Sequence, residues 1–120
     1  MAKIMVVDDA AFMRMMVKNA LAQGGYTDVC EAADGNEAVQ MYAEQKPQLV
    51  LMDITMPNMD GLEALKKIRE SDGSAQVVMC SAMGQESMVI EAIKAGAKDF
   101  IVKPFKPERI LSTVDGLIAK

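Results

Sequence analysis

The residues of this 120-residue chain that could do chemistry stand directly after short apolar segments. Asp8 and Asp9 follow one such segment, and Asp53, Ser81 and Lys103 each follow another. Carboxylates that lie close together repel one another unless a cation or a raised pKa relieves the repulsion. Carboxylate oxygens in an open site suit Mg²⁺, which often shares its coordination shell with a phosphate. A lysine and a hydroxyl beside them suit the oxygens of a transferred phosphoryl group. These residue types therefore predict phosphoryl chemistry at a magnesium site, if the fold brings them together.

Composition and charge exclude several other classes of protein. The chain contains no histidine, which excludes Ser–His triads, histidine-ligated zinc and histidine general bases. Any histidine chemistry must come from a partner. The formal net charge of -4 argues against nucleic-acid binding. No apolar run approaches the roughly 20 residues of a membrane span, and we expect no secretory signal, because residues 1–3 lead into only a short apolar run. We expect a cytoplasmic protein in which Cys30 and Cys80 are buried and reduced.

Short apolar runs alternate with helical patterns along the chain. Continuous apolar runs of this length are typical of strands that are buried on both faces. We predict strands at residues 4–7, 29–32, 49–52, 77–80 and 100–102. The run at 29–32 contains Glu31, and a charged residue suits a strand at the edge of the sheet.

The segments between and after these strands carry apolar residues at helical spacing. The predicted core positions of the five helices are Phe12, Met16, Ala20 and Leu21; Ala38, Met41 and Tyr42; Leu62, Leu65 and Ile68; Val89, Ala92 and Ile93; and Ile110, Leu111, Val114, Leu117 and Ile118. Asp34 and Pro107 stand at helix starts, and Gly24 and Gly96 stand at helix ends.

A strand followed by a helix, five times over, predicts an α/β fold: a doubly wound five-stranded parallel sheet with helices on both faces. We expect one domain over residues 1–120, with no output domain. Ligands of such sheets bind beyond the carboxyl ends of the strands, at the point where the winding reverses. The first and third strands flank that point, so Asp8, Asp9 and Asp53 are expected to converge there.

Six short motifs occur in the order and spacing of a known family. They are Val6–Asp9, Leu51–Pro57, Asp60–Gly61, Ser81–Ala82, Gly96–Ala97 and Lys103–Phe105. On these motifs the chain resembles the receiver domains of two-component response regulators over essentially its whole length. The stretches Asp9–Arg14 and Ser81–Gln85 resemble the single-domain chemotaxis regulators in particular. This resemblance implies the strand order 2-1-3-4-5.

The resemblance also implies a role for each acidic residue. Asp53 would be the phosphoacceptor, which takes a phosphoryl group from a histidine kinase. Asp9 would bind Mg²⁺ directly and Asp8 through water. Asp53 itself and the main-chain carbonyl of Thr55 would complete the protein ligands.

Further residues are implied to contact the phosphoryl group or to respond to it. Lys103 would neutralise its charge, and the Ser81 hydroxyl and the backbone N–H of Ala82 would contact its oxygens. A cis peptide between Lys103 and Pro104 would direct the lysine inward. Ser81 and Phe100 would form the switch: the hydroxyl moves toward the phosphoryl group, and the aromatic ring turns into the vacated space.

For function, the resemblance implies a chemotaxis response regulator that binds the flagellar motor switch when it is phosphorylated. Its expected partners are a chemotaxis histidine kinase, the motor switch protein and a dedicated phosphatase, with Mg²⁺ as cofactor. We expect a monomer that catalyses only its own phosphorylation and slow autodephosphorylation, and that binds neither nucleic acid nor membrane.

Three alternatives stay open at this point. A single-domain phosphorelay intermediate would have the same site and a different partner. A phosphatase with an aspartate nucleophile needs a second aspartate two residues after the nucleophile, where this chain has Thr55. A flavodoxin-type protein binds its flavin phosphate in a loop rich in Ser, Thr and Gly after the first strand, where this chain has Asp8 and Asp9.

Overall fold

Strands and helices alternate without exception in the computed structural model, which describes residues 3–54, 56, 59–82, 86–103 and 105–118. The elements are β1 (Ile4–Val7), α1 (Ala11–Gln23), β2 (Val29–Ala32), α2 (Gly35–Gln45), β3 (Leu49–Asp53), α3 (Gly61–Ser71), β4 (Val77–Ala82), α4 (Glu86–Lys94), β5 (Asp99–Lys103) and α5 (Pro107–Leu117). All strand pairs are parallel, in the order β2-β1-β3-β4-β5. The predicted fold class, the strand order and the edge position of residues 29–32 are confirmed.

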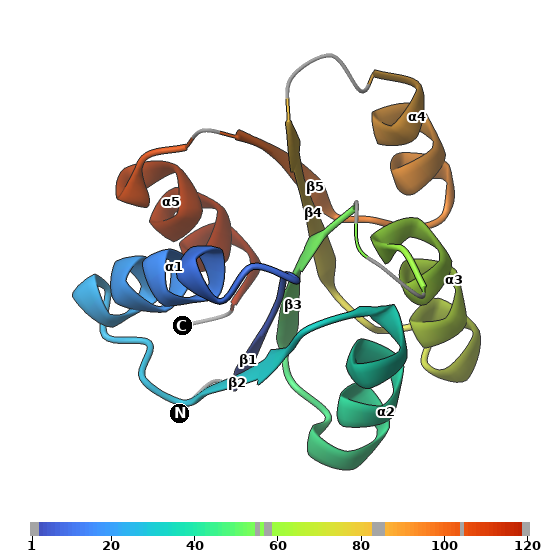
Figure 1. Cartoon of the computed structure of the whole chain (residues 1–120), viewed down its shortest axis with the longest axis horizontal. Helices are drawn as coiled ribbons and strands as arrows, with labels where there is room; N and C mark the ends of the chain where they lie inside the picture. Colours follow the sequence, from blue (N-terminus) through green and yellow to red (C-terminus); the bar gives the residue numbers. More distant parts are fainter. Residues whose placement is uncertain (1–2, 55, 57–58, 83–85, 104, 119–120) are drawn as a thin grey trace.

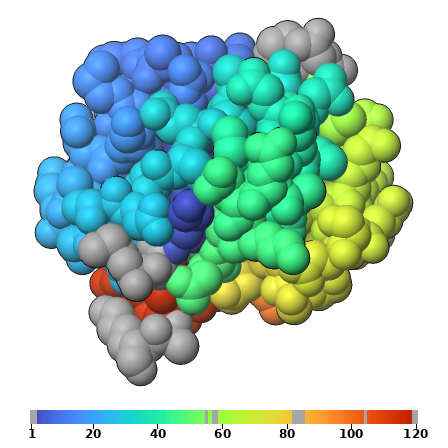
Figure 2. Space-filling view, turned by 90° about the horizontal axis from the view of Figure 1, so that it is seen from below, coloured from blue at the N-terminus to red at the C-terminus, as the bar shows by residue number. Residues whose placement is uncertain are grey.

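Helices cover both faces of the sheet (Figure 1). α1 and α5 lie on one face, and α2, α3 and α4 lie on the other. Successive side chains of a strand point to opposite faces, so Leu49 and Leu51 pack toward α1 and α5, whereas Val50 and Met52 pack toward α2 and α3. The space-filling view shows α2 between α1 and α3 at the molecular surface (Figure 2). Every residue of β1 and β3 is buried, and apart from Asp53 at the end of β3 these strands are apolar throughout.

Three strands extend further than the apolar runs that predicted them. β3 includes Asp53, β4 continues to Ala82, and β5 runs from Asp99 to Lys103. The main-chain ladder continues into polar residues here, because backbone pairing does not depend on an apolar side chain: Asp53 pairs with Cys80, and Ala82 pairs with Lys103. The candidate site residues of β3, β4 and β5 therefore lie within the sheet and share its rigidity.

Two helix faces differ from their prediction. In α1 the buried residues are Val17, Ala20 and Leu21, whereas Phe12 and Met16 are 68% and 41% exposed. Apolar residues at helical spacing form two adjacent stripes along this helix. Only the stripe that contains Val17, Ala20 and Leu21, which faces β1 and α5, is buried. In α4 only Ala92 is fully buried, and Ile93 is 51% exposed. The predicted positions of α3 are all buried.

Helix ends and cysteines mostly follow their prediction. The Asp34 carboxylate accepts a hydrogen bond from the backbone N–H of Glu37 at the start of α2, and Gly96 adopts a φ of 106° after α4. Cys80 is buried, whereas Cys30 is only partly buried, and both are free thiols. In the described part of the chain, no helix is long and apolar enough to cross a membrane.

Gly61, the first residue of α3, makes the closest approach to the functional end of β3. A Cβ atom at this position would lie 2.0 Å from the carbonyl oxygen of Asp53, and the Gly61 N–H donates a hydrogen bond to the Ile54 carbonyl at 2.7 Å. We expect Gly61→Ala to lower the free energy of unfolding by ~1–3 kcal/mol, because the backbone must move to relieve the clash. Urea unfolding measures this change.

Gly116 provides the matched control. A Cβ atom there would meet nothing within 4 Å, and the residue lies within α5. Gly116→Ala is expected to leave stability unchanged or to raise it by up to about 1 kcal/mol. Equal unfolding midpoints for Gly61→Ala and the unmodified protein would contradict the tight fit at Gly61.

Candidate functional site

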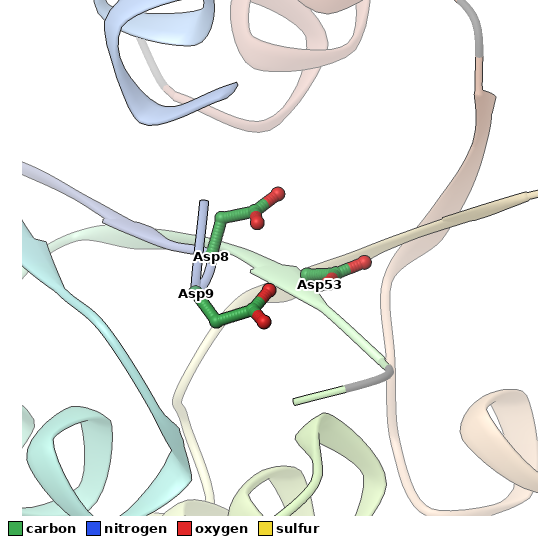
Figure 3. A group of neighbouring side chains, drawn as sticks. All are labelled: Asp8, Asp9 and Asp53. Atoms are coloured by element: carbon green, nitrogen blue, oxygen red, sulfur yellow. The ribbon is translucent and has the colours of Figure 1, made fainter. Parts of the chain in front are cut away.

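Three carboxylates gather at the carboxyl ends of the two central strands. Asp8 and Asp9 follow β1 directly, and Asp53 is the last residue of β3, the strand that pairs with β1. Their side chains extend in the same direction from these two strand ends (Figure 3). One oxygen from each lies within 4.8 Å of the others. Asp8 and Asp53 are only 6% and 8% exposed, whereas Asp9 is exposed. The predicted convergence of the three aspartates is therefore confirmed.

The side chain of Lys103 reaches the three aspartates from β5, an edge strand of the sheet. Lys103 is the last residue of β5, and its side chain reaches past β4 to the aspartates. Its Nζ atom donates hydrogen bonds to Asp8 Oδ2 and Asp53 Oδ1, both at 3.0 Å. The ammonium group therefore bridges the two buried carboxylates and neutralises part of their charge.

The surroundings shift the pKa of both Asp53 and Lys103. Burial is the main cause that raises the pKa of Asp53 above its ordinary value, and the charges of Asp8 and Asp9 add to it against the opposing effect of Lys103. Burial alone would lower the pKa of Lys103, but its hydrogen bonds to Asp53 and Asp8 outweigh burial and raise it. The lysine stays charged, but its single positive charge does not balance the negative charges of the carboxylates.

A cation would supply the missing charge, and the donor atoms determine which kind fits. All three candidate donor atoms are carboxylate oxygens, which is the donor set of Mg²⁺ and similar hard cations. The exposure of Asp9 leaves one side of the group open to solvent, as Mg²⁺ needs in order to keep its waters. Bound there, Mg²⁺ would neutralise charge on the carboxylates and on phosphoryl oxygens.

Cys80 is another nucleophilic group beside this site, and its environment makes it inert. It pairs with Asp53 in the sheet, and Asp8, Asp53 and Lys103 line the same small hollow. Burial raises the pKa of the Cys80 thiol to about 12, so it stays protonated at neutral pH. Since the thiolate is the reactive form, Asp53 is the nucleophile that this site favours.

The predicted switch residues lie on the other face of the sheet. Ser81 is buried and follows Cys80, so the alternation of side chains directs it away from the face that carries Asp53. Phe100 of β5 is partly buried and packs against the core that α2, α3 and α4 cover. The predicted residues therefore lie on two faces of the sheet. Asp53 and Lys103 lie on the face covered by α1 and α5, and Ser81 and Phe100 lie on the opposite face.

Several predicted details fall on parts of the chain that the structure leaves out. Thr55, the expected carbonyl ligand, and Pro104, the expected partner in a cis peptide, both lie outside the described residues. For Ala82 the strand pairing with Lys103 is described and its side chain is not.

Sequence reasoning missed Arg14 and Glu31. Arg14 Nη1 donates a hydrogen bond to the main-chain carbonyl of Asp8 at 2.6 Å, and Glu31 Oε1 accepts one from Arg14 Nε at 3.0 Å. A basic residue one helical turn beyond the acidic pair was the only available signal for Arg14. Nothing in the local sequence pairs it with Glu31, which is 17 residues away.

Known proteins with a similar sequence or structure belong to one family. A model of the response regulator receiver domain matches residues 4–115. The chemotaxis protein CheY of Bacillus subtilis is 58% identical over 113 residues, which cover 94% of this chain and 94% of that protein. The chemotaxis protein CheY of Thermotoga maritima is 56% identical, with 94% of each chain covered.

A solved structure adds agreement in three dimensions. A chain in the CheX–CheY–BeF₃–Mg²⁺ complex from Borrelia burgdorferi is 37% identical, with a TM-score of 0.93 over 99% of this chain and 90% of that chain. The family match covers the two central strand ends, β5 and the residues that they bring together. The chain therefore belongs to the family of response regulator receiver domains and is similar to its chemotaxis members.

Proposed function

We propose that this protein is a chemotaxis response regulator that accepts a phosphoryl group on Asp53 from the phosphohistidine of a histidine kinase, in a reaction that depends on Mg²⁺. One observation carries the proposal: Asp8, Asp9 and Asp53 each offer an oxygen within 4.8 Å of the others, beside a lysine that is hydrogen-bonded to two of them. The similarity to the CheY proteins supports the chemotaxis role.

The chain's own residues account for the parts of the transfer. An Asp53 oxygen forms a bond to phosphorus as the bond from phosphorus to the donor's imidazole nitrogen breaks, and that nitrogen keeps the electron pair. Asp8, Asp9, Asp53 and the carbonyl of Thr55 would hold Mg²⁺, and the ion would supply positive charge to neutralise the phosphoryl oxygens. Lys103 and the Ala82 N–H bind those oxygens after transfer. The Ser81 hydroxyl, which starts on the other face of the sheet, moves toward the phosphoryl group to join them. The transfer needs a histidine only on the donor, so the lack of histidine in this chain is compatible with it.

Output is proposed to pass through the face that carries Ser81 and Phe100. In this part of the described surface Ile90, Ile93 and Val102 are exposed apolar residues of α4 and β5, which suit a protein partner. We propose the flagellar motor switch as that partner, a chemotaxis kinase as phosphodonor, a dedicated phosphatase and a cytoplasmic location. The complex of the Borrelia protein with CheX supports a further protein partner.

Asp53→Asn is expected to abolish labelling of the protein by radioactive acetyl phosphate in the presence of Mg²⁺, because an amide cannot replace the carboxylate as nucleophile. The matched control is Glu70→Gln, which makes the same chemical change at an exposed position of α3. The control should be labelled as fast as the unmodified protein. Full labelling of Asp53→Asn at a single site would place the phosphoacceptor elsewhere.

Asp9→Ala is expected to weaken Mg²⁺ binding by more than about tenfold, since one charged ligand is lost. Isothermal titration calorimetry of the unphosphorylated protein measures the affinity, with Glu91→Ala on the exposed side of α4 as control. An unchanged affinity in the Asp9 variant would remove this residue from the ligand set.

A phosphoryl mimic tests the choice of partner. With beryllofluoride and Mg²⁺, the immobilised protein should retain purified flagellar motor switch protein, and without beryllofluoride it should retain much less. Asp53→Asn should retain little under either condition, because the mimic attaches to the Asp53 carboxylate. Retention of a histidine phosphotransfer protein instead of the motor protein would favour the relay intermediate.

A further inference from the structure

Arg14 connects the acidic pair to the edge strand of the sheet. It is the fourth residue of α1, and its side chain is 18% exposed. One guanidinium nitrogen donates a hydrogen bond to the carbonyl oxygen of Asp8 at 2.6 Å, and another contacts Glu31 of β2 at 3.0 Å. Glu31 binds Lys18 with its second oxygen, also at 3.0 Å. Arg14 therefore spans from β2 to the segment that carries Asp8 and Asp9.

The other contacts of Asp8 show what this hydrogen bond adds. The Asp8 N–H donates to the carbonyl of Ala32, and its Oδ1 accepts from the Ala10 N–H at 2.9 Å. Its Oδ2 accepts from Lys103. These contacts fix the nitrogen and the carboxylate of Asp8, but not the plane of the peptide that leads into Asp9. The Asp8 carbonyl belongs to that rigid plane, and Arg14 is the side chain that holds it.

Asp9 needs such a constraint more than the other two aspartates. It is exposed, whereas Asp8 and Asp53 are buried and bound to Lys103. The residue that precedes α1 is Ala10, which has no side chain able to cap the helix. The orientation of the Asp8–Asp9 peptide therefore contributes to the position of the Asp9 carboxylate, and a hydrogen bond to that peptide restricts the orientations that the peptide can adopt.

Glu31 holds the Arg14 side chain in the position from which it donates to the Asp8 carbonyl. It lies on β2 opposite Val6, two residues before Asp8 on the neighbouring strand. Hydrogen bonds from Lys18 and then from Arg14 hold the pKa of Glu31 below its usual range against the opposing effect of burial. It is thus a charged anchor on a strand that is hydrogen-bonded to the strand leading into the site.

We propose that Arg14 is a positioning residue of the Mg²⁺ site. It holds the Asp8–Asp9 peptide so that the Asp9 carboxylate is already oriented for the ion, and Glu31 holds Arg14 in place. Arg14 acts through the backbone and is not itself a ligand. This inference rests on the proposed Mg²⁺-dependent function, and groups that orient metal ligands commonly affect metal affinity by about tenfold or more when they are removed.

Calorimetric titration with Mg²⁺ alone tests the proposal in four variants. Arg14→Ala should weaken Mg²⁺ binding about tenfold. Arg14→Lys should recover part of the loss, because one compact ammonium group cannot span the Asp8 carbonyl and Glu31 as the guanidinium does. Glu31→Gln should weaken binding about threefold, as expected for a partly exposed pair. Lys18→Ala is the matched control and should bind as the unmodified protein does, because Lys18 contacts Glu31 and not Asp8.

A kinetic measurement separates positioning from a general loss of structure. In Arg14→Ala, the Mg²⁺ concentration that half-saturates phosphorylation by acetyl phosphate should rise about tenfold. The rate at saturating Mg²⁺ should stay within about twofold, since Arg14 does not contact the reacting atoms. Equal Mg²⁺ affinity in Arg14→Ala and the unmodified protein would overturn the inference, even if the melting temperature falls.

Two further outcomes have distinct meanings. If Arg14→Ala does not fold, Arg14→Lys is tested in its place, and an unchanged Mg²⁺ affinity in that variant overturns the inference. If the unmodified protein binds no Mg²⁺, the proposed function itself fails and the inference fails with it. Binding by the unmodified protein, with a loss in Arg14→Ala and none in Lys18→Ala, supports both.

Discussion

Repulsion among three carboxylates is the constraint on which this structure depends. Two of them are almost fully buried, and a single ammonium group is hydrogen-bonded to both. One positive charge against three negative charges leaves a net negative charge in the site. Burial, and to a smaller extent the charges of Asp8 and Asp9, keep the pKa of Asp53 raised despite Lys103. A fold that tolerates this imbalance must hold the charges in place with its packing. The same imbalance favours the binding of a divalent cation.

The parallel sheet provides the necessary rigidity. β1 and β3 lie side by side with every residue buried, so their ends cannot separate to relax the charges. Gly61 allows α3 to begin directly against the Asp53 carbonyl, where any larger residue would displace it. Lys103 reaches the aspartates only because β5 is held in register by β4. The position of each charged group thus follows from backbone pairing and packing far more than from attraction between the charges.

Sequence reasoning predicted the fold and the carboxylate cluster for the same physical reason. Strands buried on both faces are continuously apolar, so their ends are visible in the sequence, and the residues after those ends are the ones that a parallel sheet brings together. It did not predict which stripe of α1 is buried, because Phe12 and Met16 are as apolar as Val17 and Leu21 and only the tertiary contacts distinguish them. It also missed Arg14 and Glu31, since a contact between a helix and an edge strand leaves no periodic pattern.

Asp53 and Ser81 lie on adjacent central strands and face opposite sides of the sheet. The carboxylate cluster and the predicted switch residues therefore pack against different hydrophobic cores. Substitutions on the α2, α3 and α4 side of the sheet would therefore act first on the second core. An ancestral protein with this layout could exchange one partner for another without rebuilding its phosphorylation chemistry. The sheet, usually regarded as a scaffold, here acts as a partition that allows the two halves of a signalling protein to diversify separately.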